Sequence, residues 1–208
     1  SSGSNELNTM TRRRARVIAT LSRRSPPVRL RGPKLSGSTP EAVYEGSLQT
    51  FFQLLSSGDH IYLTWHAGDA NKPTALFFNA SDDGGKTWRQ PWTSPIRIDD
   101  GKATGDGARH PRMALRDDGG VAITWQENEK RILVRISDDG GKTWPTEPIE
   151  VANTAEKKTL RYPQVALSDK GAFVLWESWV DMTGQRKNLG DLEKPTPRDV
   201  FVRGVKRR

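Results

Sequence analysis

An identical stretch of eight residues occurs twice in this chain of 208 residues, as SDDGGKTW at 81–88 and again at 137–144. A similarity that returns after 56 residues indicates that one supersecondary unit recurs along the chain. Such a unit cannot bury its own apolar face and is stable only when it packs against a neighbouring unit. The repeat therefore predicts a fold made of stacked copies of one unit.

The residues around the octapeptide repeat in the same register. Three apolar runs end in tryptophan, each after a polar turn that contains glycine, at 61–65, 121–125 and 172–176. A further run at 132–136 alternates side chains as a sheet packed on at least one face does, and short runs follow the octapeptides at 95–98 and 148–151. Short apolar runs bounded by Gly, Asp and Pro are typical of β-strands, so each unit is predicted to contain four strands.

The octapeptide itself matches a known motif. SxDxGxTW is the Asp box, or BNR repeat, and both copies match it at every defined position, which are Ser81, Asp83, Gly85, Thr87, Trp88, Ser137, Asp139, Gly141, Thr143 and Trp144. The chain resembles the sialidase-like (neuraminidase) β-propeller superfamily over about residues 45–208. The resemblance implies that each box is a hairpin between the third and fourth strands of a blade, and that these ten residues are structural.

The expected fold class is therefore all-β, with sialidase-like propeller blades near 45–101, 107–153 and 159–208 in a segment that spans 41–208. About three four-stranded blades are half of the six-bladed ring that the resemblance implies. Closure then requires a longer protein, a second copy or another chain that covers the open edges. Alternate apolar positions on inner strands predict a wedge between blades that includes Leu63, Trp65, Ile123, Trp125, Val174 and Trp176.

Residues 1–40 are predicted to be an extended basic arm. The chain has 33 Lys and Arg and 25 Asp and Glu, and residues 12–34 hold nine of the basic residues and none of the acids. Because Glu6 is the only acid before Glu41, the remainder of the chain is electrically balanced. Such an arm suits an acidic partner or surface, although a solvated tail is the plainer interpretation.

Arg109 and Arg161 are the candidate ligand-binding residues, together with His110. They belong to two matched openings, ArgHisPro and ArgTyrPro, each placed where the first strand of a unit begins. ArgHisPro resembles the ArgIlePro of sialidases, whose arginines hold the substrate carboxylate, and guanidinium groups bind carboxylates through paired hydrogen bonds. The proline that follows favours an extended backbone at His110 and Tyr162. The alternative is that both are ordinary surface-loop arginines.

Catalytic residues are not assigned by any motif. The chemistry that the resemblance implies needs an acid/base carboxyl and a tyrosine nucleophile, for which Tyr162, Glu177 and Asp106 are weak candidates. The chain has no cysteine, which excludes disulfides and thiolate chemistry, and its three histidines lack a metal-binding spacing. We therefore expect no metal site and no cofactor.

Two classes of function follow from these features. The first is a noncatalytic binding or scaffold subunit for a glycan, an acidic ligand or a protein assembly, with a partner or second copy completing the propeller. The second is an exo-α-sialidase-like glycoside hydrolase. No run of 18 apolar residues predicts a transmembrane segment. The resemblance favours an extracytoplasmic or secreted location, with organellar and cytoplasmic locations also open.

Overall fold

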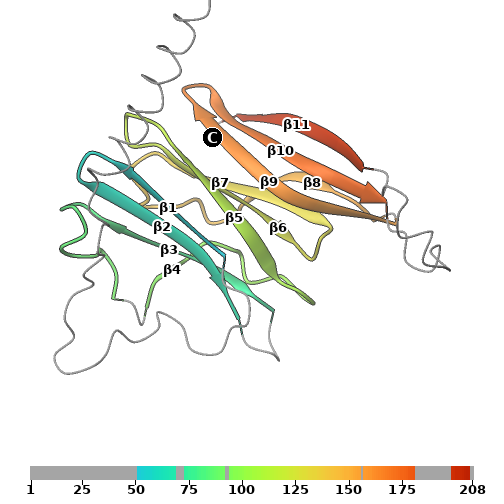
Figure 1. The fold of residues 1–208 in the computed structure, drawn as a ribbon, viewed down its shortest axis with the longest axis horizontal. Helices are drawn as coiled ribbons and strands as arrows, with labels where there is room; N and C mark the ends of the chain where they lie inside the picture. The colour runs from blue at the N-terminus through green and yellow to red at the C-terminus, as the bar shows by residue number, and fades with distance from the viewer. Residues whose placement is uncertain (1–50, 69–72, 92–93, 156, 181–197, 207–208) are drawn as a thin grey trace, which may run out of the picture. The chain divides into compact units, whose positions relative to one another are not determined.

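The described part of the molecule is all-β. The computed structural model describes residues 51–68, 73–91, 94–155, 157–180 and 198–206, and these form three antiparallel sheets without a helix (Figure 1). The all-β prediction is thus confirmed, and each sheet coincides with one predicted unit, except that the third sheet begins at Lys158, one residue before its unit. The basic arm predicted at 1–40 lies outside the described residues.

The first two sheets have four strands each, in chain order. The first sheet contains β1 (Phe52–Ser57), β2 (His60–Ala67), β3 (Ala75–Ser81) and β4 (Ile96–Arg97). The middle sheet contains β5 (Ala108–Leu115), β6 (Val121–Glu127), β7 (Arg131–Ser137) and β8 (Ile149–Asn153). The octapeptides connect β3 to β4 and β7 to β8, so they stand at the same place in both sheets.

The third sheet has three strands in the described residues, against the four that the repeat predicts. It contains β9 (Lys158–Ser168), β10 (Gly171–Val180) and β11 (Arg198–Lys206). β10 lies between its two neighbours and pairs antiparallel with both. Within the part of the chain that the structure describes, the three sheets do not close into a barrel.

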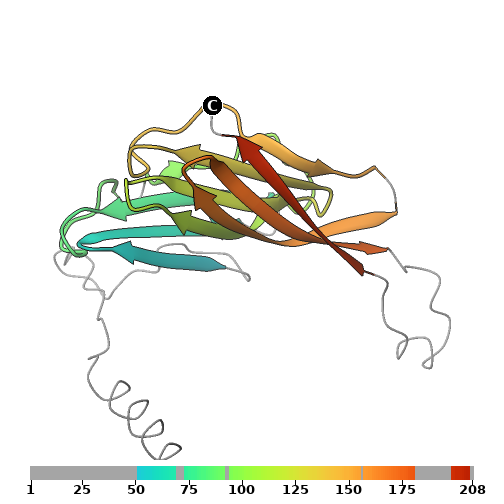
Figure 2. The same cartoon turned by 90° about the horizontal axis from the view of Figure 1, so that it is seen from above.

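The middle sheet lies between the first and the third sheets (Figure 1, Figure 2). Two hydrophobic clusters join it to these neighbours. One cluster joins Phe78 and Leu76 of the first sheet to Ile123 and Trp125 of β6. The other joins Ala122, Ile132 and Val134 of the middle sheet to Val174 and Trp176 of β10. Every residue of β6 is buried because this strand alternates its side chains between the two clusters.

The predicted wedge is confirmed at four of its six positions, and at the other two it stays a prediction. Ile123, Trp125, Val174 and Trp176 belong to the clusters, whereas Leu63 and Trp65 belong to neither. Trp65 is buried and Leu63 is half-buried on the opposite face of the first sheet. The tryptophan side of each sheet faces the sheet that precedes it, and the described residues contain no sheet before the first one.

No helix that is long and apolar enough to cross a membrane occurs among the described residues.

Candidate functional site

β5 and β9 contain equivalent irregularities at the candidate ligand-binding residues. In β5 the pairing passes from Arg109 to Arg112 across a β-bulge, and in β9 it passes from Arg161 to Gln164 in the same way. His110 and Tyr162 inside these bulges have φ angles of 53° and 52°. The left-handed backbone region is unusual for residues other than glycine, and the extended backbone predicted from the following proline is wrong.

Hydrogen bonds between sheets account for both bulges. The backbone N–H of His110 donates to Nδ1 of His66 in the first sheet at 3.1 Å. The backbone N–H of Tyr162 donates to Oε1 of Gln126 in the middle sheet, also at 3.1 Å. His66 and Gln126 each follow the last tryptophan of a predicted run. Each bulge therefore turns a backbone donor out of its own sheet toward an acceptor on the preceding one.

Aromatic rings of the middle and third sheets form a continuous row at these bulges with Phe51, which directly precedes β1. The ring centroids of Phe51 and His110 lie 4.6 Å apart, those of His110 and Tyr162 lie 5.7 Å apart, and those of Tyr162 and Trp179 lie 6.1 Å apart. These separations are typical of interacting aromatic pairs. Because Phe51 is 42% exposed and Tyr162 is 43% exposed, this aromatic row presents ring surface to solvent.

The two candidate arginines lie beside this row but hold different carboxylates. Nη2 of Arg109 is 3.3 Å from Oδ1 of Asp106. Nη2 of Arg161 is 2.7 Å from Oε2 of Glu129, and the same guanidinium lies 5.5 Å from the ring centroid of Trp179. Arg161 therefore adds a cation at the end of the aromatic row. Convergence of the two arginines on one anion stays a prediction.

The environment of His110 favours its neutral form. Burial lowers the pKa of this imidazole, and the positive charges of Arg109 and Arg112 lower it further. A hydrogen bond with Gln126 and the charge of Glu129 act in the opposite direction without reversing the effect. A neutral ring packs between aromatic neighbours without the desolvation cost of a buried charge.

The three weak catalytic candidates all have structural contacts. Asp106 pairs with Arg109, and its backbone oxygen accepts a hydrogen bond from the Thr74 hydroxyl at 2.7 Å. Oε2 of Glu177 accepts the indole N–H of Trp179 at 2.7 Å. The ring of Tyr162 lies between those of His110 and Trp179. Each of the three side chains therefore already has a partner within the structure.

In the first octapeptide hairpin the carboxylate is occupied by hydrogen bonds. Oδ1 of Asp83 accepts the Ser81 hydroxyl and the backbone N–H of Thr87, both at 2.8 Å, and Oδ2 accepts the Thr87 hydroxyl at 2.7 Å. The backbone N–H of Gly85 donates to the Ser81 oxygen at 2.9 Å. The bonds from Thr87 lower the pKa of Asp83 to about 2.

The second hairpin repeats this network. Asp139 accepts from the Ser137 hydroxyl at 2.7 Å, from the backbone N–H of Thr143 at 2.9 Å and from the Thr143 hydroxyl at 2.6 Å. Burial raises the pKa of Asp139, but the bonds from Thr143 and Ser137 outweigh it, and the result is about 2. Trp144 then packs edge-on against Phe78 of the first sheet, with ring centroids 5.2 Å apart. These contacts support a structural role for the octapeptides.

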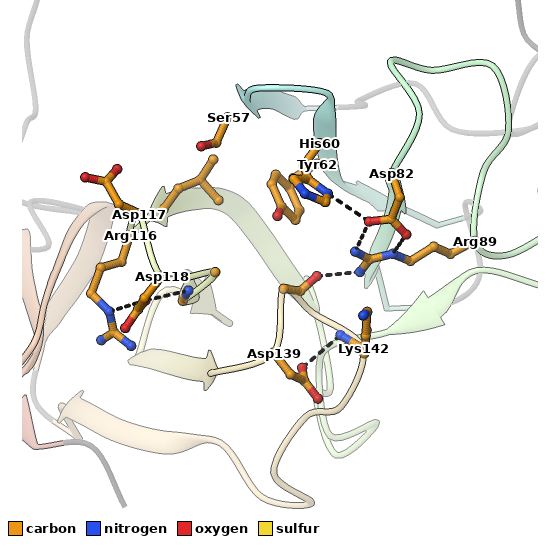
Figure 3. A pocket seen from close by; sticks show the side chains of 14 residues that line it. Ser57, His60, Tyr62, Asp82, Arg89, Arg116, Asp117, Asp118, Asp139 and Lys142 are labelled. Atoms are coloured by element: carbon orange, nitrogen blue, oxygen red, sulfur yellow. Dashed lines mark hydrogen bonds and ion pairs between the residues drawn. The ribbon is translucent and has the colours of Figure 1, made fainter.

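A pocket of about 310 Å³ lies between the two hairpins (Figure 3). Five of the charged or titratable side chains that line it are paired with one another. Nε of Arg89 donates to Oδ2 of Asp82 at 2.7 Å, Nδ1 of His60 lies 2.9 Å from Oδ1 of Asp82, and Nε of Arg116 donates to Asp118 at 2.6 Å. These pairs join the two hairpins across the pocket, whose lining also contains Asp117 and Lys142.

Several residues at the bulges were not found from the sequence. They are His66, Gln126, Glu129 and Trp179. The signal that was available is that His66 and Gln126 directly follow equivalent tryptophans. No group of three or more metal-ligating side chains is present among the described residues.

Comparison with known proteins identifies no family. No protein-family model matches the chain, and no curated protein matches it. The solved structures that are similar to it include the following two. One is a protein of unknown function from Dyadobacter fermentans DSM 18053, with 15% identity, a TM-score of 0.41, and coverage of 71% of this chain and 40% of that chain. The other is a DUF4623 family protein from Bacteroides eggerthii DSM 20697, with 16% identity, a TM-score of 0.40, and coverage of 58% and 26%. The chain therefore spans less than half the length of either protein.

Proposed function

We propose that this chain is a segment of a sialidase-like Asp-box β-propeller that serves as a noncatalytic binding module for an acidic glycan. The observation that carries the proposal is the aromatic row Phe51–His110–Tyr162–Trp179, with the Arg161 guanidinium over its end. Flat rings give apolar contact to the C–H face of a sugar, and a guanidinium gives paired hydrogen bonds to a carboxylate. The row supplies the stacking surface, and the carboxylate of an acidic sugar would compete with Glu129, which is paired with Arg161 at 2.7 Å.

The propeller part of the proposal is supported by the repeated architecture. Two sheets carry the octapeptide between their third and fourth strands, and the internal hydrogen bonds of the two hairpins are the same. The bulges at His110 and Tyr162 recur at one position of successive sheets. Each sheet then corresponds to a blade, and the bulged first strands correspond to the side on which such a ring binds its ligand.

The noncatalytic assignment is supported by the contacts of the candidate carboxylates. Asp106 is paired with Arg109, and Glu177 accepts the indole N–H of Trp179. A sialidase-like hydrolase is the second candidate. The observation that favours it is the exposure of Tyr162 in the row next to Arg161.

The test measures the affinity for a sialylated trisaccharide and for its asialo counterpart by calorimetry, together with hydrolysis of a fluorogenic sialoside. We expect binding that prefers the acidic sugar, with no turnover. Trp179→Ala and Arg161→Ala should each weaken binding at least about tenfold, because stacking and paired charge contacts are typical affinity hot spots. Phe201→Ala is the matched control, since this ring is 45% exposed but stacks on Trp176 outside the row.

Tyr162→Phe separates the two candidate functions. It keeps the ring and removes the hydroxyl, so a binding module should keep most of its affinity. Turnover by the wild type that disappears in Tyr162→Phe would establish the hydrolase instead. Equal affinity for the two trisaccharides, or unchanged binding in Trp179→Ala, would contradict the proposed site.

A further inference from the structure

Each sheet of the repeat has two distinct faces. We call the face that carries the strand-ending tryptophan the preceding face, and the opposite one the following face. The following face of the first sheet, with Phe78 and Leu76, packs on the preceding face of the middle sheet, with Ile123 and Trp125. The following face of the middle sheet packs on the preceding face of the third in the same way. Both contacts inside the chain therefore join one following face to one preceding face.

The following face of the third sheet is apolar and exposed. Phe173 is 51% exposed and Leu175 is 38% exposed, and they alternate along β10 with the buried Val174 and Trp176. Val202 is the Cα partner of Leu175 on β11, so it lies on the same face, and it is 67% exposed. Val200, two residues away on the same strand, is 61% exposed. Contiguous apolar residues of this kind mark an interaction surface.

The preceding face of the first sheet is the complementary one. Phe52 is 68% exposed and Leu54 is 40% exposed on β1. Their Cα partners on β2 are Trp65 and Leu63, the residues that correspond to Trp125 and Ile123 of the middle sheet. The first sheet thus presents the kind of face on which a following face packs elsewhere in the chain.

We propose that these two faces bind each other between two copies of this chain. The third sheet of one copy packs on the first sheet of the other, and the reciprocal contact closes a ring of two chains. The proposal continues an interface that already occurs twice inside the chain, and it rests on the blade arrangement of the proposed function but not on the glycan. A second copy supplies one face of each kind, so two equal contacts cover all four exposed faces.

The test is the native mass of the full chain and of two charged variants. Val202→Asp places a carboxylate on the third sheet, and Leu54→Arg places a guanidinium on the first. Both positions are exposed in one copy, so each variant should fold with an unchanged far-ultraviolet circular dichroism spectrum. We expect a dimer for the wild type and a dimer dissociation constant raised at least about tenfold in either variant, because each buries a charge twice in the ring. Thr146→Asp adds the same charge to an exposed hairpin position as a control.

Mixing the two variants tests the pairing of unlike faces. In a mixed ring one contact brings the carboxylate introduced by Val202→Asp toward the guanidinium introduced by Leu54→Arg, and the other contact is entirely wild type. A heterodimer should therefore form where neither variant dimerises alone, and native mass spectrometry distinguishes it by mass. If either variant fails to fold, Val200→Asp and Phe52→Arg probe the same two faces.

A wild type that is monomeric at tens of micromolar, or that forms polymers, would overturn the ring. A dimer that survives Leu54→Arg would also overturn it, since contact between two third sheets does not use β1. These outcomes are separate from those of the glycan test: a monomer that binds the acidic trisaccharide refutes the ring alone, and a dimer that binds neither trisaccharide refutes only the glycan assignment.

Discussion

His66 accepts the backbone N–H of His110 at its Nδ1 atom, across the boundary between the first and middle sheets. The side chain of His66 is buried, so nothing from solvent replaces this bond when the acceptor is lost. His66→Leu should therefore lower the free energy of unfolding by about 1–3 kcal/mol. Urea titration measures the change. His66→Gln is the matched control, because Gln126 performs the same role at the next boundary, and equal losses in the two variants would contradict the explanation.

The positive φ of Tyr162 reverses the usual ranking of glycine and alanine in a strand. Inside a regular strand glycine is less stable than alanine, but at a φ of 52° the β-carbon of alanine is strained and glycine is not. Tyr162→Gly should therefore be more stable than Tyr162→Ala by about 1 kcal/mol. Thermal unfolding of the two variants measures which of them is more stable. The same pair at Ala166, a β9 residue outside the bulge, should show alanine as the more stable residue.

The octapeptide carboxylates predict loss of stability in acid. Asp83 and Asp139 have pKa values of about 2 in the folded chain, below their ordinary value of 3.8. A carboxyl whose folded pKa is depressed contributes stability above the unfolded pKa and loses it as the pH falls through the folded value. The unfolding free energy should thus fall between about pH 4 and pH 2.

Asp82 adds to the same trend, because its hydrogen bond with Arg89 holds its pKa far below the ordinary value. The double variant Asp83→Asn and Asp139→Asn should show a shallower pH dependence than the wild type when urea unfolding is repeated at each pH. If the unfolding free energy of the double variant depends on pH as steeply as that of the wild type, other groups cause the loss of stability in acid.

Trp125 is the largest fully buried side chain between the first and middle sheets. Trp125→Ala should cost about 3–5 kcal/mol, since removal of a buried indole leaves a cavity. Its indole N–H has no hydrogen-bond partner, so Trp125→Phe keeps most of the apolar area and removes an unpaired donor. Urea unfolding should show a clearly higher free energy of unfolding for Trp125→Phe than for Trp125→Ala. Similar losses of unfolding free energy in the two variants would mean that interactions other than apolar packing stabilise the indole.

Local patterns were enough to predict the strands. The tryptophan-ended runs and the two octapeptides identified β2, β6 and β10 and the hairpins after β3 and β7. Each of these signals lies within a few residues, where strand alternation and turn preferences act. Alternation also placed Leu63 and Trp65 on the face equivalent to that of Ile123 and Trp125, but it does not say which neighbour covers that face.

The candidate site depended on contacts that the local sequence does not encode. Proline favours an extended residue before it, yet at His110 and Tyr162 an acceptor on another sheet decides the backbone conformation. Trp179 lies at the end of β10, beyond the run that predicted the strand, so its place in the aromatic row was not anticipated. Such a row becomes visible only once three separate sheets are assembled.

Arg89 must be included when the repeated hairpin is transplanted into another protein. The two octapeptides are identical in letters, but the first is followed by Arg89 and the second by Pro145. Arg89 reaches the backbone oxygen of Gly140 in the neighbouring hairpin, a link that Pro145 has no side-chain donor to make. The segment to transplant, where a second hairpin follows, is therefore the nine residues Ser81 to Arg89. The first eight residues form the loop, and Arg89 binds it to the neighbouring hairpin.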